Sequence, residues 1–371
     1  RPAASPRRCA PVDLVACPQM ADDSTAALPA PPPVSSARET IARNAASVPG
    51  TTRFQARIMT AVVVIPFLAF LLAIWLLWGR LVAWYDLVTL VVFYVPAALG
   101  ITVGFHRMLT HRAFEAKAPV RAFFLAAGST ALEGGAIAWT VDHRTHHALS
   151  DKEGDPHSPH VGHEDEEGIG ALLRGLWHAH AGWMFDGTRM RQVEKYGKDL
   201  LQDELVVFFQ RTFLLWVVAG IAAPGLLAFL LSGFEPKALL TGILWGGLVR
   251  IFLTHHVTWS VNSICHVYGK RPFRSDDLST NNWVLAIPTM GESWHHNHHA
   301  FPTSAYHGLT RRQLDLSGAV IGLLERLGLV WNVRRPSSEQ IDRKLEEPGA
   351  LRGGLRRAVR ERSAAPPDDE G

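Results

Sequence analysis

Charged residues are scarce in this sequence. Of its 371 residues only 19% are Asp, Glu, Lys or Arg, whereas soluble domains carry about a quarter. The 37 basic and 34 acidic side chains leave a formal net charge of +3, which is too small a surplus to favour a nucleic-acid partner. Mean hydropathy is slightly positive, at +0.06. This composition favours an integral membrane protein or an enzyme with a large buried core.

Cysteine is also rare. The three cysteines are Cys9, Cys17 and Cys265, and none belongs to a Cys-x-x-Cys pair. Three cysteines cannot build a disulfide framework. The sequence is therefore not that of a small disulfide-stabilised protein.

Four long apolar stretches are present. Residues 58–79 carry no charge over 22 residues, and a helix of that length, at about 1.5 Å per residue, crosses a hydrocarbon core of about 30 Å. Residues 87–105, 212–234 and 238–266 are the other three predicted spans. The last contains Arg250 and several histidines, which marks either a functional site at membrane depth or a helix that projects beyond the bilayer.

Lys and Arg are unevenly distributed around these spans. The segments before the first span, between the second and third, and after the fourth contain 7, 12 and 15 of them, and the two short links contain one each. Both termini and both long segments are therefore predicted to face the cytosol. A composition rich in Ala, Arg and Gly and poor in Lys and Tyr suggests a bacterial plasma membrane. Residues 1–52 and most of 339–371 are expected to be disordered, with Met20 as a candidate natural start.

Histidine is the residue that this sequence concentrates. Ten of its 18 histidines fall in four short motifs on the predicted cytosolic side, HRMLTH, HRTHH, NSICH and HHNHH, and all of them except His296 are candidate ligands. The motifs contain His106 and His111; His143, His146 and His147; His266; and His295, His298 and His299. Offsets of three and four residues place imidazoles on one face of a helix. His106 and His111 are five apart, about 140° around an α-helix, which suits two centres or a frayed helix end.

Nine imidazoles indicate more than one metal ion. Neutral imidazole is a ligand for zinc, copper, iron and nickel, and a tetrahedral zinc takes only four ligands. The nine fit two metals with four or five ligands each. Only one Glu-x-x-His pair, Glu292 and His295, accompanies them, whereas a carboxylate-bridged di-iron bundle has two.

With these residues in view, the chain resembles the membrane-bound fatty acyl desaturases, in particular the stearoyl-CoA (delta-9) type, over about residues 53–335. The three histidine boxes HxxxxH, HxxHH and HxxHH occur in that family's order, and EGDPHSP, RGLWHAHAGW, TWSVNSICHVYG and GESWHHNHH match further landmarks. The resemblance implies an all-α integral membrane protein in which four transmembrane helices lie under a cytosolic helical cap that holds a di-iron centre. The desaturase domain would be residues 53–338, with the cap formed by 106–211 and 267–338.

The resemblance also implies the site residues. Two iron ions would be held by His106, His111, His143, His146, His147, His266, His295, His298 and His299, with Asn262 reaching one of them through a water. Dioxygen would be the co-substrate. Substrate contacts would come from Trp139, Arg144, Arg174, His180 and Trp183, although interfacial packing of the aromatic rings and surface arginines near anionic lipid are alternatives. Asp142 is either an orienting partner of His143 or a solvated acid.

The activity implied is an O₂-dependent desaturation that introduces a cis double bond, at delta-9, into a saturated long-chain acyl group. Acyl-CoA is the favoured carrier and acyl-lipid the alternative, since the acidic insertion at 160–173 weakens the case for CoA. No haem-binding HPGG motif occurs, so electrons would come from a separate ferredoxin with its reductase or a cytochrome b5-like protein. A membrane hydroxylase or alkane monooxygenase on the same histidines, and a non-enzymatic membrane metal-binding protein, are the competing interpretations.

Overall fold

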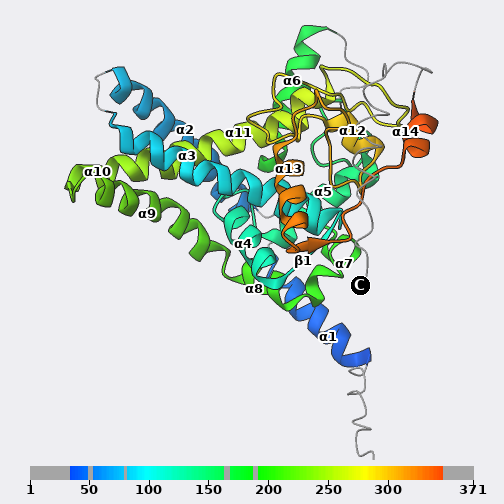
Figure 1. The fold of residues 1–371 in the computed structure, drawn as a ribbon, viewed down its shortest axis with the longest axis horizontal. Helices are drawn as coiled ribbons and strands as arrows, with labels where there is room; N and C mark the ends of the chain where they lie inside the picture. Colours follow the sequence, from blue (N-terminus) through cyan, green and yellow to red (C-terminus); the bar gives the residue numbers. More distant parts are fainter. Residues whose placement is uncertain (1–33, 49–52, 79–81, 163–167, 187–190, 346–371) are drawn as a thin grey trace, which may run out of the picture.

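The structure is a computed structural model that describes residues 34–48, 53–78, 82–162, 168–186 and 191–345. Over these residues the chain is mostly helical, and its strands form one short antiparallel pair, β1 (Glu115–Ala116) and β2 (Val330–Trp331). Long helices run out to one side of the molecule and shorter helices gather at the other end (Figure 1). The predicted all-α membrane architecture is confirmed.

Among the described residues, four helical segments are long and apolar enough to cross a membrane: Arg57–Leu77, Trp84–Thr110, Phe213–Leu231 and Pro236–His266. They are built by α2 (Arg53–Trp78); by α3 (Trp84–Leu99) with η1 (Gly100–Thr110); by α9 (Phe213–Leu231); and by α10 (Pro236–Gly242) with η4 (Ile243–Val249), α11 (Arg250–Ser263) and η5 (Ile264–His266). Large apolar side chains such as Trp75 and Leu214 are more than two-thirds exposed on these helices, at 70% and 73%. The four predicted spans are thus confirmed.

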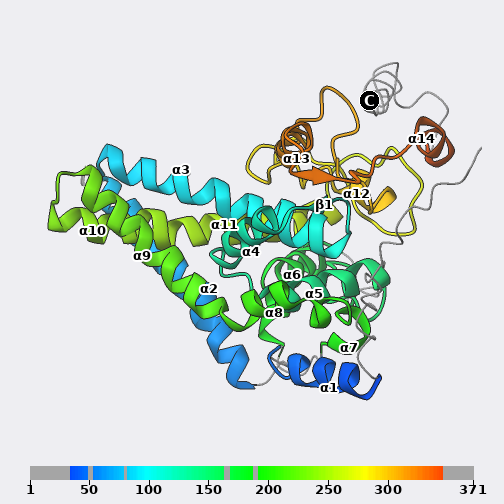
Figure 2. The same cartoon turned by 60° about the horizontal axis from the view of Figure 1, so that its bottom comes forward.

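Shorter helices lie at one end of the spans and form the cap. In chain order they are α4 (Ala118–Ser129), α5 (Ala136–Leu149), α6 (Ile169–His180), η2 (Gly182–Phe185), α7 (Val193–Tyr196), η3 (Leu200–Gln202), α8 (Glu204–Arg211), α12 (His295–Ala300), α13 (Leu316–Arg326) and α14 (Ser338–Lys344). β1 pairs with β2, and Glu115 lies opposite Trp331. This pairing joins the chain segment after the second span to the segment after the fourth span (Figure 2). Both long segments therefore build one cap.

The second span changes helix type where it reaches the first histidine box. η1 is a π-helix, in which hydrogen bonds join residues five apart, and the His111 amide donates to the His106 carbonyl at 3.2 Å. Residues five apart therefore lie nearly above one another. Both rings belong to one group of potential ligands, so the alternative of two centres, which assumed α-helical geometry, is wrong. His111 is the C-cap of η1 and thus lies at the helix end.

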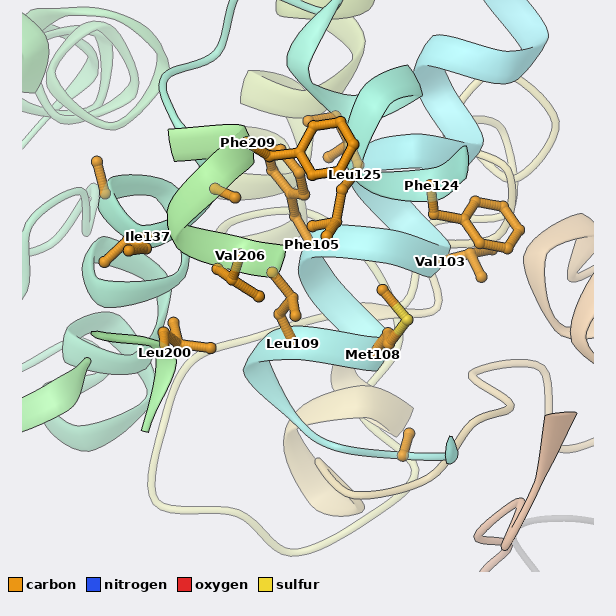
Figure 3. Packing of buried hydrophobic residues seen from close by; sticks show 14 of the residues in the cluster. Val103, Phe105, Met108, Leu109, Phe124, Leu125, Ile137, Leu200, Val206 and Phe209 are labelled. Atoms are coloured by element: carbon orange, nitrogen blue, oxygen red, sulfur yellow. The ribbon is translucent and has the colours of Figure 1, made fainter. Parts of the chain in front are cut away.

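Close packing fixes η1 against the cap. A Cβ atom on Gly100 would lie 2.0 Å from the backbone nitrogen of Gly128 in α4, so the two elements approach at a distance that only glycine permits. Beside this crossing Phe105, Leu125 and Phe209 belong to one buried apolar cluster with side chains of α5 and η3 (Figure 3). The cluster holds the start of the first histidine box in a defined position.

Two described helices lie where disorder was expected, α1 (Val34–Ala45) within 1–52 and α14 at the start of the C-terminal tail. Asn44, at the end of α1, is buried; its amide donates to the Leu201 carbonyl at 2.7 Å and accepts from Arg211 at 2.8 Å. Ile341 of α14 is buried in a cluster with Phe273. Tertiary contacts stabilise both helices. α1 lies inside a segment for which disorder was predicted throughout, whereas α14 occupies only the first residues of a tail predicted to be largely disordered. Residues 1–33, 49–52 and 346–371 lie outside the described residues.

The polar residues of the fourth span serve two purposes. Arg250 is fully buried and its guanidinium donates to three backbone carbonyls, at 2.6, 2.9 and 3.3 Å. His255 is also buried, and its Nε2 lies 2.9 Å from the carbonyl of Ala131. These two side chains satisfy backbone groups, whereas His266 at the end of the span faces the other histidines.

Candidate metal centre

The nine predicted histidines converge where the spans meet the cap. Within the described residues they form two groups in which the potential ligand atoms lie within 4.8 Å of one another. The first set is His106, His111, His143, His147 and His298, and the second set is His146, His266, His295 and His299. The rings of His147 and His299 stack at 4.5 Å, so the two sets are adjacent. Sets of five and four agree with the expectation of two metal ions.

Contacts between the imidazole nitrogens fit metal ligation. Nε2 of His106 lies 3.0 Å from Nε2 of His298, and Nε2 of His295 lies 3.0 Å from Nε2 of both His266 and His299. Two nitrogen ligands at right angles on one metal, each about 2.1 Å from it, would be about 3.0 Å apart. The buried Nε2 of His146 has no hydrogen-bond partner among the described residues. The donor sets therefore fit metal ions.

Carboxylates outside the two sets determine which nitrogen faces inward. Four of the nine rings donate a hydrogen bond from Nδ1 to a carboxylate: His106 to Glu292 (2.5 Å), His146 to Asp155 (2.9 Å), His266 to Asp151 (2.9 Å) and His299 to Asp277 (3.2 Å). With the proton held on Nδ1, the Nε2 lone pair is free to bind a metal.

Burial keeps most of these rings neutral. It lowers the pKa of His111 to about 3, and together with the neighbouring imidazoles it lowers the pKa of His143, His147, His295, His298 and His299 well below the ordinary value. For His146, burial also acts to lower the pKa, but Asp155 outweighs it and the pKa is raised. A metal ion requires the neutral ring, so low pKa values favour binding.

A buried charge network lies behind the first set. Glu292, whose other oxygen contacts His106, accepts two hydrogen bonds from Arg107, at 2.9 and 3.2 Å. Arg107 also donates to Asp315 at 3.0 and 3.1 Å, and Nδ1 of His307 lies 3.3 Å from Glu292. Burial raises the pKa of Glu292 to about 7 although Arg107 opposes the shift. The network ties η1 to the start of α13 and orients His106.

A largely apolar cavity of about 610 Å³ reaches the centre. Its walls come from α2, α3, η1, α5, α11 and the cap, and include Val62 and Ile101. His106 and His143 of the first set and His295 of the second set line it as well. A cavity with this lining suits a long apolar ligand held against the histidine centre.

Glu133 brings a carboxyl group into this cavity. Its Oε2 accepts a hydrogen bond from the indole of Trp139 at 3.1 Å, and its buried Oε1 has no hydrogen-bond partner among the described residues. Burial raises the pKa of Glu133 to about 7, against hydrogen bonds from Thr258 and Trp139 that act to lower it. The Trp139 ring stacks on His143, with centroids 5.1 Å apart, so Glu133 is linked to the first set through one side chain.

Two of the five predicted substrate-binding residues line the cavity, Trp139 and Trp183. Arg144 lies outside its lining and donates to a carboxylate and three backbone carbonyls. His180 contacts two polar side chains of α11, and Arg174 is exposed on α6. The structure thus brings only the two tryptophans to the cavity beside the histidines.

The two polar residues predicted beside the histidines have different positions. Asn262 lines the cavity and belongs to neither histidine set, so a contact through water stays a prediction. Asp142 accepts two hydrogen bonds from Nε of Arg191, at 2.9 and 3.0 Å. Both partners of this ion pair line the cavity.

Comparison with known proteins agrees with this geometry. Residues 83–317 match the family model of the fatty acid desaturases. The chain belongs to the fatty acid desaturase family. The matched region contains all nine histidines, and the predicted resemblance to the fatty acyl desaturases is confirmed.

Several curated relatives of this desaturase-family chain are more than a third identical to it. A hex-5-enoyl-[acyl-carrier protein] acetylenase of Moorena producens (strain JHB) is 38% identical over 284 residues, 76% of this chain and 87% of the relative. An sn-1 stearoyl-lipid 9-desaturase of Anabaena variabilis is 36% identical over 254 residues, 68% of this chain and 85% of the relative. An acyl-CoA C20 Delta5-desaturase of Anemone leveillei is 39% identical over 248 residues, 66% and 72% respectively. These names differ in carrier and in position of the new bond.

Sequence reasoning missed the carboxylates that orient the histidines of this desaturase-family centre. Asp155 lies in EGDPHSP and Glu292 in GESWHHNHH, two motifs already noted as landmarks. Their partners, His146 and His106, are 9 and 186 positions away in sequence. Motif membership could have marked both acids as functional, but only the fold shows which ring each one meets.

Proposed function

We propose that this chain is an O₂-dependent di-iron fatty acyl desaturase that introduces a cis double bond, at delta-9, into a saturated long-chain acyl group. The observation that carries the proposal is the meeting of the two histidine sets with the largely apolar cavity that runs between the spans. The family and the name of the stearoyl-lipid 9-desaturase relative support it.

The first and second sets would each hold one iron, and Asn262 would contact one of them through a water. Two bound iron ions would supply, with dioxygen and two electrons, the oxidising power to remove two hydrogens from an unactivated –CH₂–CH₂– unit, with water as the other product. The carboxylates on Nδ1 would hold the rings in place. Their role is to fix the Nε2 atoms before any metal arrives.

Position along the acyl chain would be set by confinement. A bound chain would displace water from the cavity between α2, α3 and α11, and Trp139 lies between Glu133 and His143 at the point where the cavity reaches the first set. A chain held in such a channel presents one pair of carbons to the metals, and this restriction replaces the chemical activation that a methylene lacks. Trp139 and Trp183 are the residues that we expect to contact the chain.

The acyl carrier would bind where the cavity has basic residues. Arg191 and Arg211 line it, and both are held by neighbouring residues, Arg191 by Asp142 and Arg211 by Asn44. We favour acyl-CoA, with acyl-lipid as the alternative. His160 of the acidic insertion, part of which lies outside the described residues, contacts the His266 carbonyl at 2.7 Å, which gives the insertion a structural role beside any effect on the carrier.

The distribution of Lys and Arg supports a topology with both termini and the cap in the cytosol of a bacterium and the spans in its plasma membrane. A ferredoxin with its reductase, or a cytochrome b5-like protein, would deliver the electrons to the cap. A basic cytosolic face favours an acidic donor of this kind.

The test is the fatty-acid profile of cells that lack their own desaturase, with the chain and an electron donor expressed together. We expect a new cis-9 monounsaturated acid, located by mass spectrometry, that disappears in His146→Ala and persists in His178→Ala, a histidine of α6 outside both sets. A double bond at another carbon would correct the position alone, and hydroxylated chains would indicate the hydroxylase. No new product, with iron bound and a working donor, would refute the proposal.

A further inference from the structure

Two separate cavities reach the histidine centre. The acyl cavity described above is lined by His106, His143 and His295. A second cavity of about 360 Å³ is lined by His111, His147 and His299. Each cavity is thus lined by histidines of both sets. Among the described residues, none lines both cavities.

The second cavity differs from the first in chemistry. Besides the three histidines, its lining is Thr110, Arg144, Asp277, Pro302 and Thr303. All except Pro302 carry a polar or charged side chain, and none comes from the long apolar stretches of α2, α9 or α11. A long acyl chain would find no apolar wall to pack against in this cavity. Small molecules that dissolve in water can enter it.

The walls of the second cavity are held by dense hydrogen bonding. Arg144 donates to both oxygens of Asp199, at 2.7 and 3.0 Å, and to the carbonyls of Leu109, Thr110 and Tyr196. Asp277, which also lines the cavity, accepts from His299, at 3.2 Å, and from the amide of Ser279, at 2.9 Å. Side chains fixed in this way are preorganised to keep a passage open.

A second approach matters because an acyl chain would occupy the first one. If a chain fills the acyl cavity, the faces of His106, His143 and His295 are covered. Small reactants would then have to enter from elsewhere. The second cavity offers such a way, because it reaches His111, His147 and His299 and, among the residues that the structure describes, shares no lining residue with the acyl cavity.

We propose that the second cavity is a separate route for small uncharged molecules, by which dioxygen reaches the histidine centre and product water leaves it while the acyl chain occupies the first cavity. The inference rests on the proposed function. Thr303 is exposed in a turn at this cavity, so it is the position at which the route can be narrowed without touching a histidine or its carboxylate.

The test uses the full-length, iron-loaded and reduced protein in detergent, saturated with stearoyl-CoA, and nitric oxide as a neutral diatomic probe. Stopped-flow absorbance follows nitric oxide binding in wild type, Thr303→Trp and the control Thr303→Ser. We expect Thr303→Trp to slow association by at least about tenfold when the acyl cavity is full, and Thr303→Ser to match wild type. Thr303→Phe serves as the second blocking variant if the tryptophan variant does not fold.

Two further measurements keep the outcomes distinct. Iron content and stearoyl-CoA affinity, read from tryptophan fluorescence, should be the same in all variants. Equal nitric oxide association in wild type and in the folded blocking variants would overturn the access route and indicate entry through the lipid-facing side. A wild-type protein that binds no iron would instead refute the proposed function on which the inference rests.

Discussion

Glu133 should make acyl binding depend on pH, and Glu133→Gln should remove that dependence. The residue lies in the cavity with Oε2 bound to Trp139 and Oε1 without a hydrogen-bond partner among the described residues. Glutamine has the same shape and can accept the same indole hydrogen bond, but it cannot ionise. The substitution therefore changes charge with little change in volume.

The sign follows from the raised pKa. Burial raises the pKa of Glu133 from its ordinary 4.5 to about 7, so the folded protein holds this proton more tightly than the unfolded chain does. The contribution to stability is fully present below pH 4.5 and is lost as pH rises through 7. A shift of this size corresponds to about 3 kcal/mol. Glu133→Gln should recover most of that free energy of unfolding at pH 8.

Acyl binding has the same sign and a magnitude that can be measured directly. An apolar chain would displace water that stabilises the carboxylate, so it should bind the protonated form. Affinity should then fall about tenfold per pH unit above about 7. Other ionisable groups also line the cavity: Tyr94, Asp142, Asp186, Glu292, Arg191, Arg211 and the four histidines His106, His143, His157 and His295. Only the part of the pH dependence that Glu133→Gln abolishes belongs to Glu133.

The assay is stearoyl-CoA binding between pH 6 and 9, followed by tryptophan fluorescence, because Trp139 and Trp183 line the same cavity. The reasoning is refuted if wild-type affinity is constant over this range. It is refuted equally if Glu133→Gln keeps the wild-type profile.

Two further substitutions test how the site and the fold are held. Asp155→Asn should weaken iron binding about 10- to 100-fold, because it disturbs the partner that orients His146. The control is Asp142→Asn, which alters an acid paired with Arg191 and should leave iron content near wild type. If a chelator removes iron equally from both variants, Asp155 does not orient His146 for metal binding. Gly100→Ala should lower stability by about 1–3 kcal/mol or more, because its Cβ would meet α4 backbone at 2.0 Å. Gly170→Ala should not, because its Cβ would meet only the guanidinium of Arg174, at 3.6 Å. Thermal unfolding in detergent measures the difference, and similar melting temperatures would count against the close approach of η1 and α4.

The spans and the histidines could be predicted because they are local signals. An uncharged run such as 58–79 has few structural alternatives, and the i, i+3, i+4 spacing of His143, His146 and His147 already places three rings on one face of α5. The count of nine also led directly to two metal ions. Which ring joins which set could not be read from spacing, because His146 belongs with His299 while its neighbour His147 belongs with His298.

Other features depend on contacts that only the folded chain creates. Arg144 and Arg174 were expected near the substrate because of their charge, yet a fixed carboxylate binds the first and the second is exposed on α6. Glu133 could not be recognised in the sequence, because a single acidic residue among apolar ones is common. Only the folded structure shows that its carboxyl group is buried in the cavity. Asn44 likewise stabilises α1 through a partner 157 residues away.

The π-helical turn of η1 has an implication for how such sequences are compared. A π-helix accommodates one more residue per hydrogen-bonded turn than an α-helix, as a single-residue insertion would produce. The first histidine motif has a spacing of five while the others have three and four, so its longer spacing records the altered backbone. Deleting one residue between His106 and His111 would restore an α-helical register and the commoner spacing, and yet it would swing one ring out of the first set. A one-residue gap between His106 and His111 in a sequence alignment would therefore mean a change in the geometry of the first set.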